Sequence, residues 1–208
     1  MMLANDCPVE LASGLVHLPQ VLLEPMKIVN ALTPILQQAP LRHMQTRRGF
    51  KLSAAMSNCG ALGWVSDRLG YRYQTHDPET GKPWPEMPVM FSKVAVELAA
   101  RAGYAHFRPD VCLINCYAVG AKMALHQDAD EQDFSQPIVS LSFGLPVLFL
   151  WGGLQRSDPV QKIVLDHSDA LVWGGSSRLN FHGVASLRKG NHPLLGEQRI
   201  NLTFRRAC

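Results

Sequence analysis

The sequence lacks a hydrophobic run of the kind that crosses a membrane. A transmembrane helix needs roughly 18 or more continuous apolar residues, whereas glycines, prolines and serines interrupt the longest uncharged stretch, residues 134–155. The first residues, MMLANDCPVELASG, carry acidic side chains where an export signal carries basic ones. We therefore expect a cytoplasmic protein without a membrane partner.

The sequence also lacks a cysteine framework. Its five cysteines are an odd number at scattered spacings, which favours reduced thiols over disulfides. Cys112 and Cys116 are close to each other in the apolar run VCLINCY, but a zinc site built from cysteines usually draws on a second pair. We expect both to be buried on a strand rather than to bind a metal.

Acidic residues are missing from one long window. No Asp or Glu occurs between Pro25 and Ser66, and this window of a chain with a net charge of +3 holds Lys27, Arg42, Arg47, Arg48 and Lys51. Such a window is either a solvated basic loop or a surface that faces phosphate, because Lys and Arg supply most of the sequence-independent affinity for nucleic acid. Charge alone does not separate the two interpretations.

What is present indicates one compact domain with an N-terminal extension, residues 1–38. Hydrophobic residues make up 47% and charged residues 18% of the 208 residues, a balance that excludes a disordered chain. Residues 14–38 have apolar residues at helical spacing, interrupted at Pro25 and Pro34, which predicts one or two short helices.

The rest of the chain predicts a helix followed by many strands. Residues 91–104 have a helical pattern with Ser92 as the N-cap and Gly103 at the C-terminal end, and the Pro-rich residues 77–88 predict a loop. From Asp110 onward the sequence pattern changes to short runs rich in β-forming residues, namely VCLINCYA, PIVSLSFG, PVLFLWGG, KIVLDHSDALVWGG, RLNFHGV and RINLTFRR. Short strands at this spacing are typical of a sandwich, a barrel or a jelly roll.

Three side chains in this β-rich half have the pattern of a metal site. His126 and Asp128 are two residues apart, so on an extended chain their side chains point the same way, and His182 lies on a later strand. One carboxylate and two imidazoles on one face of a metal suit non-heme Fe(II) oxygenases. H-x-D alone occurs in many chains by chance, and a single His182 beside Phe181 is more often a core or surface histidine.

The last strand adds a charged face. Polar and apolar residues alternate strictly in RINLTFR, which puts Arg199, Asn201, Thr203 and Arg205 on one side. The two arginines lie ~20 Å apart at their Cα atoms, and their inward-leaning side chains would leave room for a short dicarboxylate. The same pattern is typical of a solvated sheet. A zinc hydrolase is the other metal enzyme to consider, but it has no use for these arginines.

Several ordered segments resemble a known family. Asn115-Cys-Tyr117, GAKMALHQDADE, PIVSLSFGLPVLFLWGG, DALVWGGSSRLNFHGV and RINLTFR are similar to the AlkB family of Fe(II)/2-oxoglutarate-dependent dioxygenases, and to its bacterial members above all. MSNCGALGWVSDRLGYRY and DPETGKPWPEMP extend the resemblance to residues 39–205. The family implies a mainly β fold with flanking helices (α+β), with a double-stranded β-helix (jelly-roll) core. The dioxygenase domain would span 39–208, with a nucleotide-recognition lid at about 41–73 and the core at about 110–208.

The resemblance also implies a role for each candidate site residue. Iron would be held by the catalytic residues His126, Asp128 and His182. The co-substrate 2-oxoglutarate would pair its distal carboxylate with Arg199 and Tyr117, and its metal-proximal carboxylate with Arg205, Asn115 and Asn201. Trp64 would stack on a flipped base with His126 on the other face, and the substrate pocket would be completed by Met56, Tyr71, Asp130 and Arg156.

The implied activity is oxidative demethylation of N-alkylated bases such as 1-methyladenine and 3-methylcytosine. It would consume O₂ and 2-oxoglutarate and release formaldehyde, succinate and CO₂. We expect a monomer that acts on alkylated single- or double-stranded DNA, with RNA or protein as alternative substrates. A non-catalytic binder of damaged bases is disfavoured, because a binder needs neither the metal ligands nor the arginines.

Overall fold

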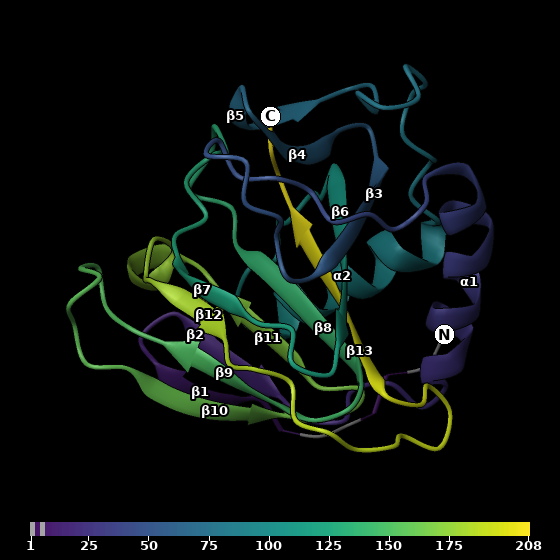
Figure 1. The fold of residues 1–208 in the computed structure, drawn as a ribbon. Helices are drawn as coiled ribbons and strands as arrows, with labels where there is room; N and C mark the ends of the chain where they lie inside the picture. Colours follow the sequence, from purple (N-terminus) through teal and green to yellow (C-terminus); the bar gives the residue numbers. More distant parts are fainter. Residues whose placement is uncertain (1–2, 5–6) are drawn as a thin grey trace.

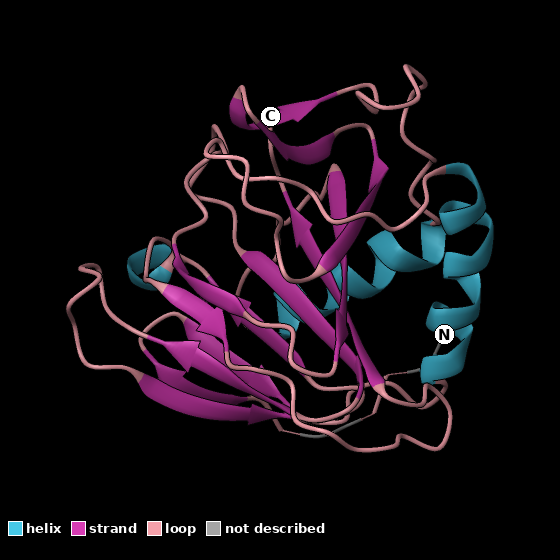
Figure 2. Ribbon diagram, in the orientation of Figure 1, coloured by secondary structure: helices cyan, strands magenta, loops and turns pink. Residues whose placement is uncertain are grey.

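Strands dominate the molecule, as the second half of the sequence predicts (Figure 2). The computed structural model describes residues 3–4 and 7–208. A larger and a smaller antiparallel sheet pack against each other, with helices on the outer side of the larger one (Figure 1). None of the helices in the described ranges is long and apolar enough to cross a membrane.

The larger sheet contains the central strand of the molecule. Its order is β1-β2-β11-β8-β13-β6-β3. The bounds of these strands are Val9–Ala12 (β1), Leu15–Leu18 (β2), Ala170–Trp173 (β11), Ile138–Gly144 (β8), Gln198–Arg205 (β13), Val111–Ala118 (β6) and Ala55–Gly60 (β3). Because β13 lies between β8 and β6, both of its edges are hydrogen-bonded and its side chains are held at fixed positions.

The smaller sheet and a separate hairpin complete the strands. The smaller sheet has the order β10-β9-β12-β7, with bounds Gln161–Leu165 (β10), Val147–Trp151 (β9), His182–Val184 (β12) and Met123–His126 (β7). The hairpin joins β4 (Gly63–Asp67) to β5 (Gly70–Gln74) and lies at the top of Figure 1. A short 3-10 helix, Gly175–Ser177 (η1), precedes β12.

The predicted alternation of β13 is confirmed by what each face contacts. Ile200, Leu202 and Phe204 pack into a hydrophobic core with the helices α1 (Pro25–Gln38) and α2 (Val89–Arg101). The opposite, polar face of the strand is turned toward the smaller sheet, where Asn201 and Arg205 line a cavity. The fold therefore places the charged side chains of the last strand between the two sheets.

Two local predictions about the helices are wrong. Pro34 does not interrupt α1, because Ile28, Leu32 and Ile35 bury one continuous apolar face of this helix and that packing outweighs the local cost of the proline. Ser92 is not an N-cap, since α2 already begins at Val89 and the Ser92 hydroxyl donates to the Val89 carbonyl. Gly103 does follow the helix, with a φ of +93°.

The sequence predicted only short helices in the N-terminal region, but the structure also has strands there. β2 pairs with β11, with Leu18 opposite Ala170, so residues 9–18 belong to the same sheet as the strands of the predicted core. These strands are four residues long, which is too short for a periodic pattern to be recognised. Residues 1–2 and 5–6 of the predicted extension lie outside the described residues.

Candidate active site

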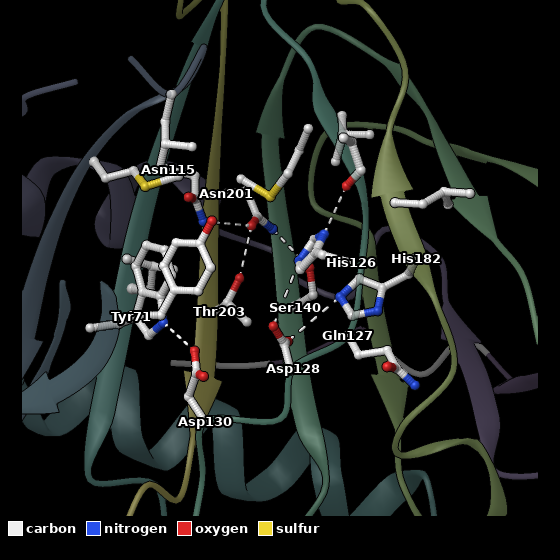
Figure 3. Close-up of a pocket in the computed structure, with 18 of the residues that line it drawn as sticks. Tyr71, Asn115, His126, Gln127, Asp128, Asp130, Ser140, His182, Asn201 and Thr203 are labelled. Atoms are coloured by element: carbon white, nitrogen blue, oxygen red, sulfur yellow. Dashed lines mark hydrogen bonds and ion pairs between the residues drawn. The ribbon is translucent and has the colours of Figure 1, made fainter. Parts of the chain in front are cut away.

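The structure brings together the three residues that the sequence predicted to hold a metal (Figure 3). His126 ends β7 and lies directly opposite His182, the first residue of β12. Nε2 of His126 is 3.6 Å from Asp128 Oδ1, and Nε2 of His182 is 3.5 Å from Asp128 Oδ2. Within the described part of the chain, they form the one His/Cys/Asp/Glu group whose ligand atoms all lie within 4.8 Å of one another.

The protonation states of these residues fit a metal. Burial, followed by the neighbouring His182, lowers the pKa of His126 to about 4, so its imidazole is neutral near pH 7. Burial opposes the ionisation of Asp128, but the Arg205 charge and the two histidines outweigh it and hold the pKa of Asp128 well below its usual range. Two imidazoles with one carboxylate are a donor set that suits Fe(II).

The orientation of both rings is fixed by backbone carbonyls. Nδ1 of His126 is 2.9 Å from the Ala124 carbonyl oxygen, and Nδ1 of His182 is 3.0 Å from that of Asn180. A carbonyl only accepts, so each Nδ1 carries a proton, and each Nε2 is the ring nitrogen that faces Asp128. The chain has therefore set the tautomer that metal binding requires.

A cavity of about 470 Å³ extends from the three ligands to the surface. Every sequence-predicted site residue except Arg199 lines it. The floor is the polar face of β13 with its neighbour β6, where Asn115 Nδ2 donates to Asn201 Oδ1 (3.3 Å) and the Thr203 hydroxyl donates to the same oxygen (2.9 Å). Arg205 Nη2 donates to Asp128 Oδ2 at 2.8 Å, beside the metal ligands.

Arg199 lies behind the cavity wall, next to Tyr117. Its side chain is 1% exposed, its guanidinium carbon is 5.2 Å from the centre of the Tyr117 ring, and Nη2 donates to the Ser142 hydroxyl at 2.9 Å. Its Nε and Nη1 are buried and form no hydrogen bond with any residue that the structure describes. A buried guanidinium with two free donors is unfavourable by itself and fits a carboxylate, which is the group that 2-oxoglutarate would supply.

The residues that the sequence predicted to bind a substrate base line the same cavity, and the half-exposed Tyr71 is at its mouth. Trp64 of β4 and Tyr71 of β5 stack with ring centres 5.5 Å apart and planes inclined by 19°. Trp64 Nε1 donates to Asp130 Oδ2 at 2.8 Å, so one Asp130 oxygen already has a partner. Met56 is buried in the cavity wall, and Arg156, which also lines the cavity, donates from Nη1 to the Leu125 carbonyl (2.8 Å).

A group of charged residues behind the metal ligands is not predicted by the sequence. Glu131 and Arg178 are buried and form an ion pair at 3.1 Å, and the Tyr73 hydroxyl donates to Glu131 at 2.6 Å. Glu131 belongs to the acidic segment DADEQD, which looks like a solvated loop in the sequence. No local signal marks it as buried, because its partners come from other elements.

Comparisons with known proteins agree with this geometry. The model of the 2OG-Fe(II) oxygenase superfamily matches residues 14–205. An alpha-ketoglutarate-dependent dioxygenase AlkB from Salmonella typhimurium is 56% identical over 174 residues, which are 84% of this chain and 81% of that protein. A DNA N(6)-methyladenine demethylase ALKBH1D from Arabidopsis thaliana is 37% identical over 184 residues, covering 76% of this chain and 40% of the relative.

A solved structure shows the same architecture. The structure of OsALKBH1 superimposes with a TM-score of 0.84 at 29% sequence identity and covers 96% of this chain and 99% of its own. The mostly β-sheet architecture with two helices is confirmed, and it is consistent with the jelly-roll core that the sequence predicted. With its His-Asp-His triad between the sheets, the chain belongs to the 2OG-Fe(II) oxygenase superfamily and, within it, to the AlkB family of Fe(II)/2-oxoglutarate-dependent dioxygenases.

Proposed function

We propose that this dioxygenase removes methyl groups from N-alkylated nucleic-acid bases of the 1-methyladenine and 3-methylcytosine type. The observation that carries the proposal is the combination within one cavity of a His-Asp-His triad at the bottom and an aromatic pair, Trp64 and Tyr71, at the mouth. A planar base can stack on the aromatic pair while its methyl group points toward the triad. The A. thaliana relative, named a DNA demethylase, supports a base as the substrate.

The triad and the polar residues around it have the following roles in this proposal. His126, Asp128 and His182 would hold Fe(II), and Arg199 with Tyr117 would hold the distal carboxylate of 2-oxoglutarate. Arg205, Asn115 and Asn201 would contact its metal-proximal carboxylate. Bound together, Fe(II) and 2-oxoglutarate supply an oxidant made from O₂ that converts the N-methyl group to formaldehyde, with succinate and CO₂ as the other products.

The base must leave its stack to reach the triad, at a cost of a few kcal/mol. Stacking on an aromatic ring returns about 1–3 kcal/mol per base, which gives Trp64 the largest single share among the mouth residues. Asp130 fixes the Trp64 ring through Nε1 and keeps its second carboxylate oxygen for an exocyclic amine of the base. Met56 and Arg156 bound the pocket on its other sides.

We further propose that residues 41–73 act as a lid that binds the nucleic-acid strand. Support comes from a tight turn next to the cavity mouth, in which the Thr46 amide donates to the Phe50 carbonyl and Gly49 has a φ of +83°. Arg47 and Arg48 are exposed at this turn, and the Phe50 side chain is 70% exposed. Because Thr46 lines the cavity, these charges would meet the phosphates that flank a flipped base.

The proposal is tested by incubating the Fe(II)-loaded chain with 2-oxoglutarate, O₂ and a panel of methylated substrates. The panel contains single- and double-stranded DNA with one 1-methyladenine, the matching RNA, and a lysine-methylated peptide. We expect the methyl group to be lost from a nucleic acid and not from the peptide. Demethylation of the peptide alone would replace the proposal by protein demethylation, and tight binding of methylated strands without methyl loss would indicate a damage binder.

A further inference from the structure

A buried network of charged residues connects the candidate metal site to the β4–β5 hairpin, and its members Glu131, Arg178 and Tyr73 have no role in the reaction proposed above. Its centre is Glu131, which is 5% exposed. Oε2 of Glu131 accepts from Arg178 Nη2 at 3.1 Å, and Oε1 lies 3.4 Å from Arg205 Nε. One carboxylate is thus shared by two buried guanidinium groups, and removing one member of such a cluster leaves an uncompensated charge.

The two arginines of this network both hold Asp128, a candidate metal ligand. Arg178 Nη1 donates to the Asp128 backbone carbonyl at 2.7 Å, and Arg205 Nη2 donates to its side-chain Oδ2 at 2.8 Å. Both the backbone and the carboxylate of this ligand are therefore positioned by groups that Glu131 orients. Arg205 is also the residue proposed to contact the metal-proximal carboxylate of 2-oxoglutarate.

Tyr73 connects the same network to the hairpin. Its hydroxyl donates to Glu131 Oε1 at 2.6 Å and accepts from Arg205 Nη1 at 3.4 Å. Burial raises the pKa of Tyr73 well above its usual value of 10.0, so the hydroxyl keeps its proton and remains a donor. Tyr73 is the direct cross-strand partner of Trp64, the proposed base-stacking residue.

Residues 128–131 thus have contacts at both ends of the cavity. Asp128 belongs to the metal triad, whereas Asp130 accepts from Trp64 and Glu131 accepts from Tyr73. A shift of the hairpin has to move Glu131 or break its hydrogen bond, and either change disturbs Arg205. Contiguous hydrogen bonds and ion pairs of this kind are one physical route by which two sites become energetically coupled.

We propose that Tyr73 and Glu131 are positioning residues that couple binding of the methylated base to occupancy of the co-substrate site. Arg205, once it contacts the carboxylate of 2-oxoglutarate, holds Tyr73 and with it the strand that faces Trp64. Affinity for the methylated base then rises when 2-oxoglutarate is present, and by thermodynamic reciprocity the base raises the affinity for 2-oxoglutarate. This inference rests on the proposed function.

The experiment measures binding without turnover. A fluorescent strand with one 1-methyladenine, and its unmethylated counterpart, are titrated with the Fe(II)-loaded chain under anaerobic conditions, with and without 2-oxoglutarate. We expect 2-oxoglutarate to tighten binding of the methylated strand by the wild type about 5-fold or more, the lower end of usual coupling factors. Tyr73→Phe removes only the hydroxyl, and its coupling factor should fall to within about twofold of unity.

Two further variants separate this role from a merely structural one. Tyr104→Phe removes a hydroxyl that donates to the Gly14 carbonyl (3.3 Å) away from the cavity, and it should keep the wild-type coupling. Glu131→Gln keeps an oxygen for Tyr73 but removes the charge between the arginines. We expect it to lose the coupling and also to raise the 2-oxoglutarate concentration that half-saturates the visible charge-transfer band of the anaerobic Fe(II) complex.

The outcomes are distinct. Wild-type coupling in Tyr73→Phe, or an equal loss of coupling in Tyr104→Phe, overturns the assignment of Tyr73. A wild type that prefers the methylated strand to the same degree with and without 2-oxoglutarate overturns the inference and leaves the proposed function standing. A wild type that neither prefers nor demethylates the methylated strand refutes the proposed function, and the coupling with it.

Discussion

At the scale of one residue, Arg199 is a buried charged side chain that has no carboxylate partner among the described residues. Burial lowers its pKa, and the nearby Tyr117 counteracts part of that effect, yet an arginine stays protonated in proteins. Its remaining polar contact is the neutral hydroxyl of Ser142. The structure therefore keeps a buried positive charge, which is costly unless a carboxylate completes the site.

The first prediction concerns this charge. Arg199→Ala should raise the concentration of 2-oxoglutarate needed for half-saturation by about 100-fold, because a desolvated carboxylate–guanidinium pair is worth a few kcal/mol and 1.4 kcal/mol is tenfold. The measurement is a 2-oxoglutarate titration of succinate release. Arg206→Ala, which removes a half-exposed arginine paired with Asp110, is the control and should behave as the wild type. An unchanged requirement in Arg199→Ala would place the distal carboxylate elsewhere.

The second prediction concerns the metal ligands. Fe(II) and 2-oxoglutarate together should give the anaerobic chain a visible charge-transfer band, and His126→Ala, Asp128→Ala and His182→Ala should each abolish it. Each of these changes removes one of three protein ligands. His106→Ala removes an exposed histidine outside the cavity and should leave the band intact. A full-strength band in all three ligand variants would contradict the metal assignment.

At the scale of elements, the β4–β5 hairpin and the turn around Gly49 are separate from the jelly-roll core. The hairpin forms a sheet of its own, and the turn, which follows α1 in the sequence, is joined to β4 by hydrogen bonds between Gln45 and Ser66. The proposed function gives base stacking to residues of the hairpin and phosphate binding to Arg47 and Arg48 of the turn. Variants of each element should affect different measurements.

The third prediction separates stacking from the chemistry at the metal. Trp64→Ala should reduce demethylation of a methylated oligonucleotide about 10- to 100-fold, which corresponds to the loss of ~1–3 kcal/mol of base stacking. The charge-transfer band should persist, since Trp64 lies at the cavity mouth and not among the metal ligands. Trp64→Phe keeps an aromatic face and should recover part of the loss. Normal demethylation by Trp64→Ala would show that the base stacks elsewhere.

The fourth prediction concerns the basic turn. Replacing Arg47 and Arg48 together with Ala should weaken binding to methylated and unmethylated strands alike, and reduce the slope of log K against log salt by up to about two units. The matched control replaces Arg188 and Lys189, two adjacent exposed basic residues of the β12–β13 loop. If both double variants keep the wild-type slope, the basic window is the solvated loop that the sequence left as an alternative.

At the scale of the whole molecule, the features predicted best from the sequence are those that depend on a few neighbouring residues. The H-x-D motif and the alternation of Arg199 with Ile200 are visible in a few letters, and the structure places both as expected. β1 and β2 were missed because each is only four residues long and because β11, the strand that pairs with β2, is far along the chain. Glu131 was missed for the second of these reasons, since its burial depends on Tyr73, Arg178 and Arg205 from other elements.

The N-terminal region shows how packing overrides a local rule. A proline inside a helix normally interrupts it. The helix α1 nevertheless continues through Pro34, because the apolar face of the helix packs into the core that it shares with α2 and β13. The division at residue 38 was drawn from local pattern alone, whereas residues 9–18 contribute strands to the larger sheet. Nonlocal pairing of this kind is what a single sequence reveals least.

The proposed demethylation of nucleic-acid bases is tested most directly when the oligonucleotide and the small products are measured in the same reaction. A DNA strand with one 1-methyladenine is incubated with the chain, Fe(II), 2-oxoglutarate and O₂, and analysed by mass spectrometry together with formaldehyde and succinate. We expect the strand to lose the mass of one CH₂ group, with equal amounts of formaldehyde and succinate, and no change when 2-oxoglutarate is omitted or His182 is replaced by Ala. Succinate formed without any change in the strand would contradict a demethylase of nucleic-acid bases.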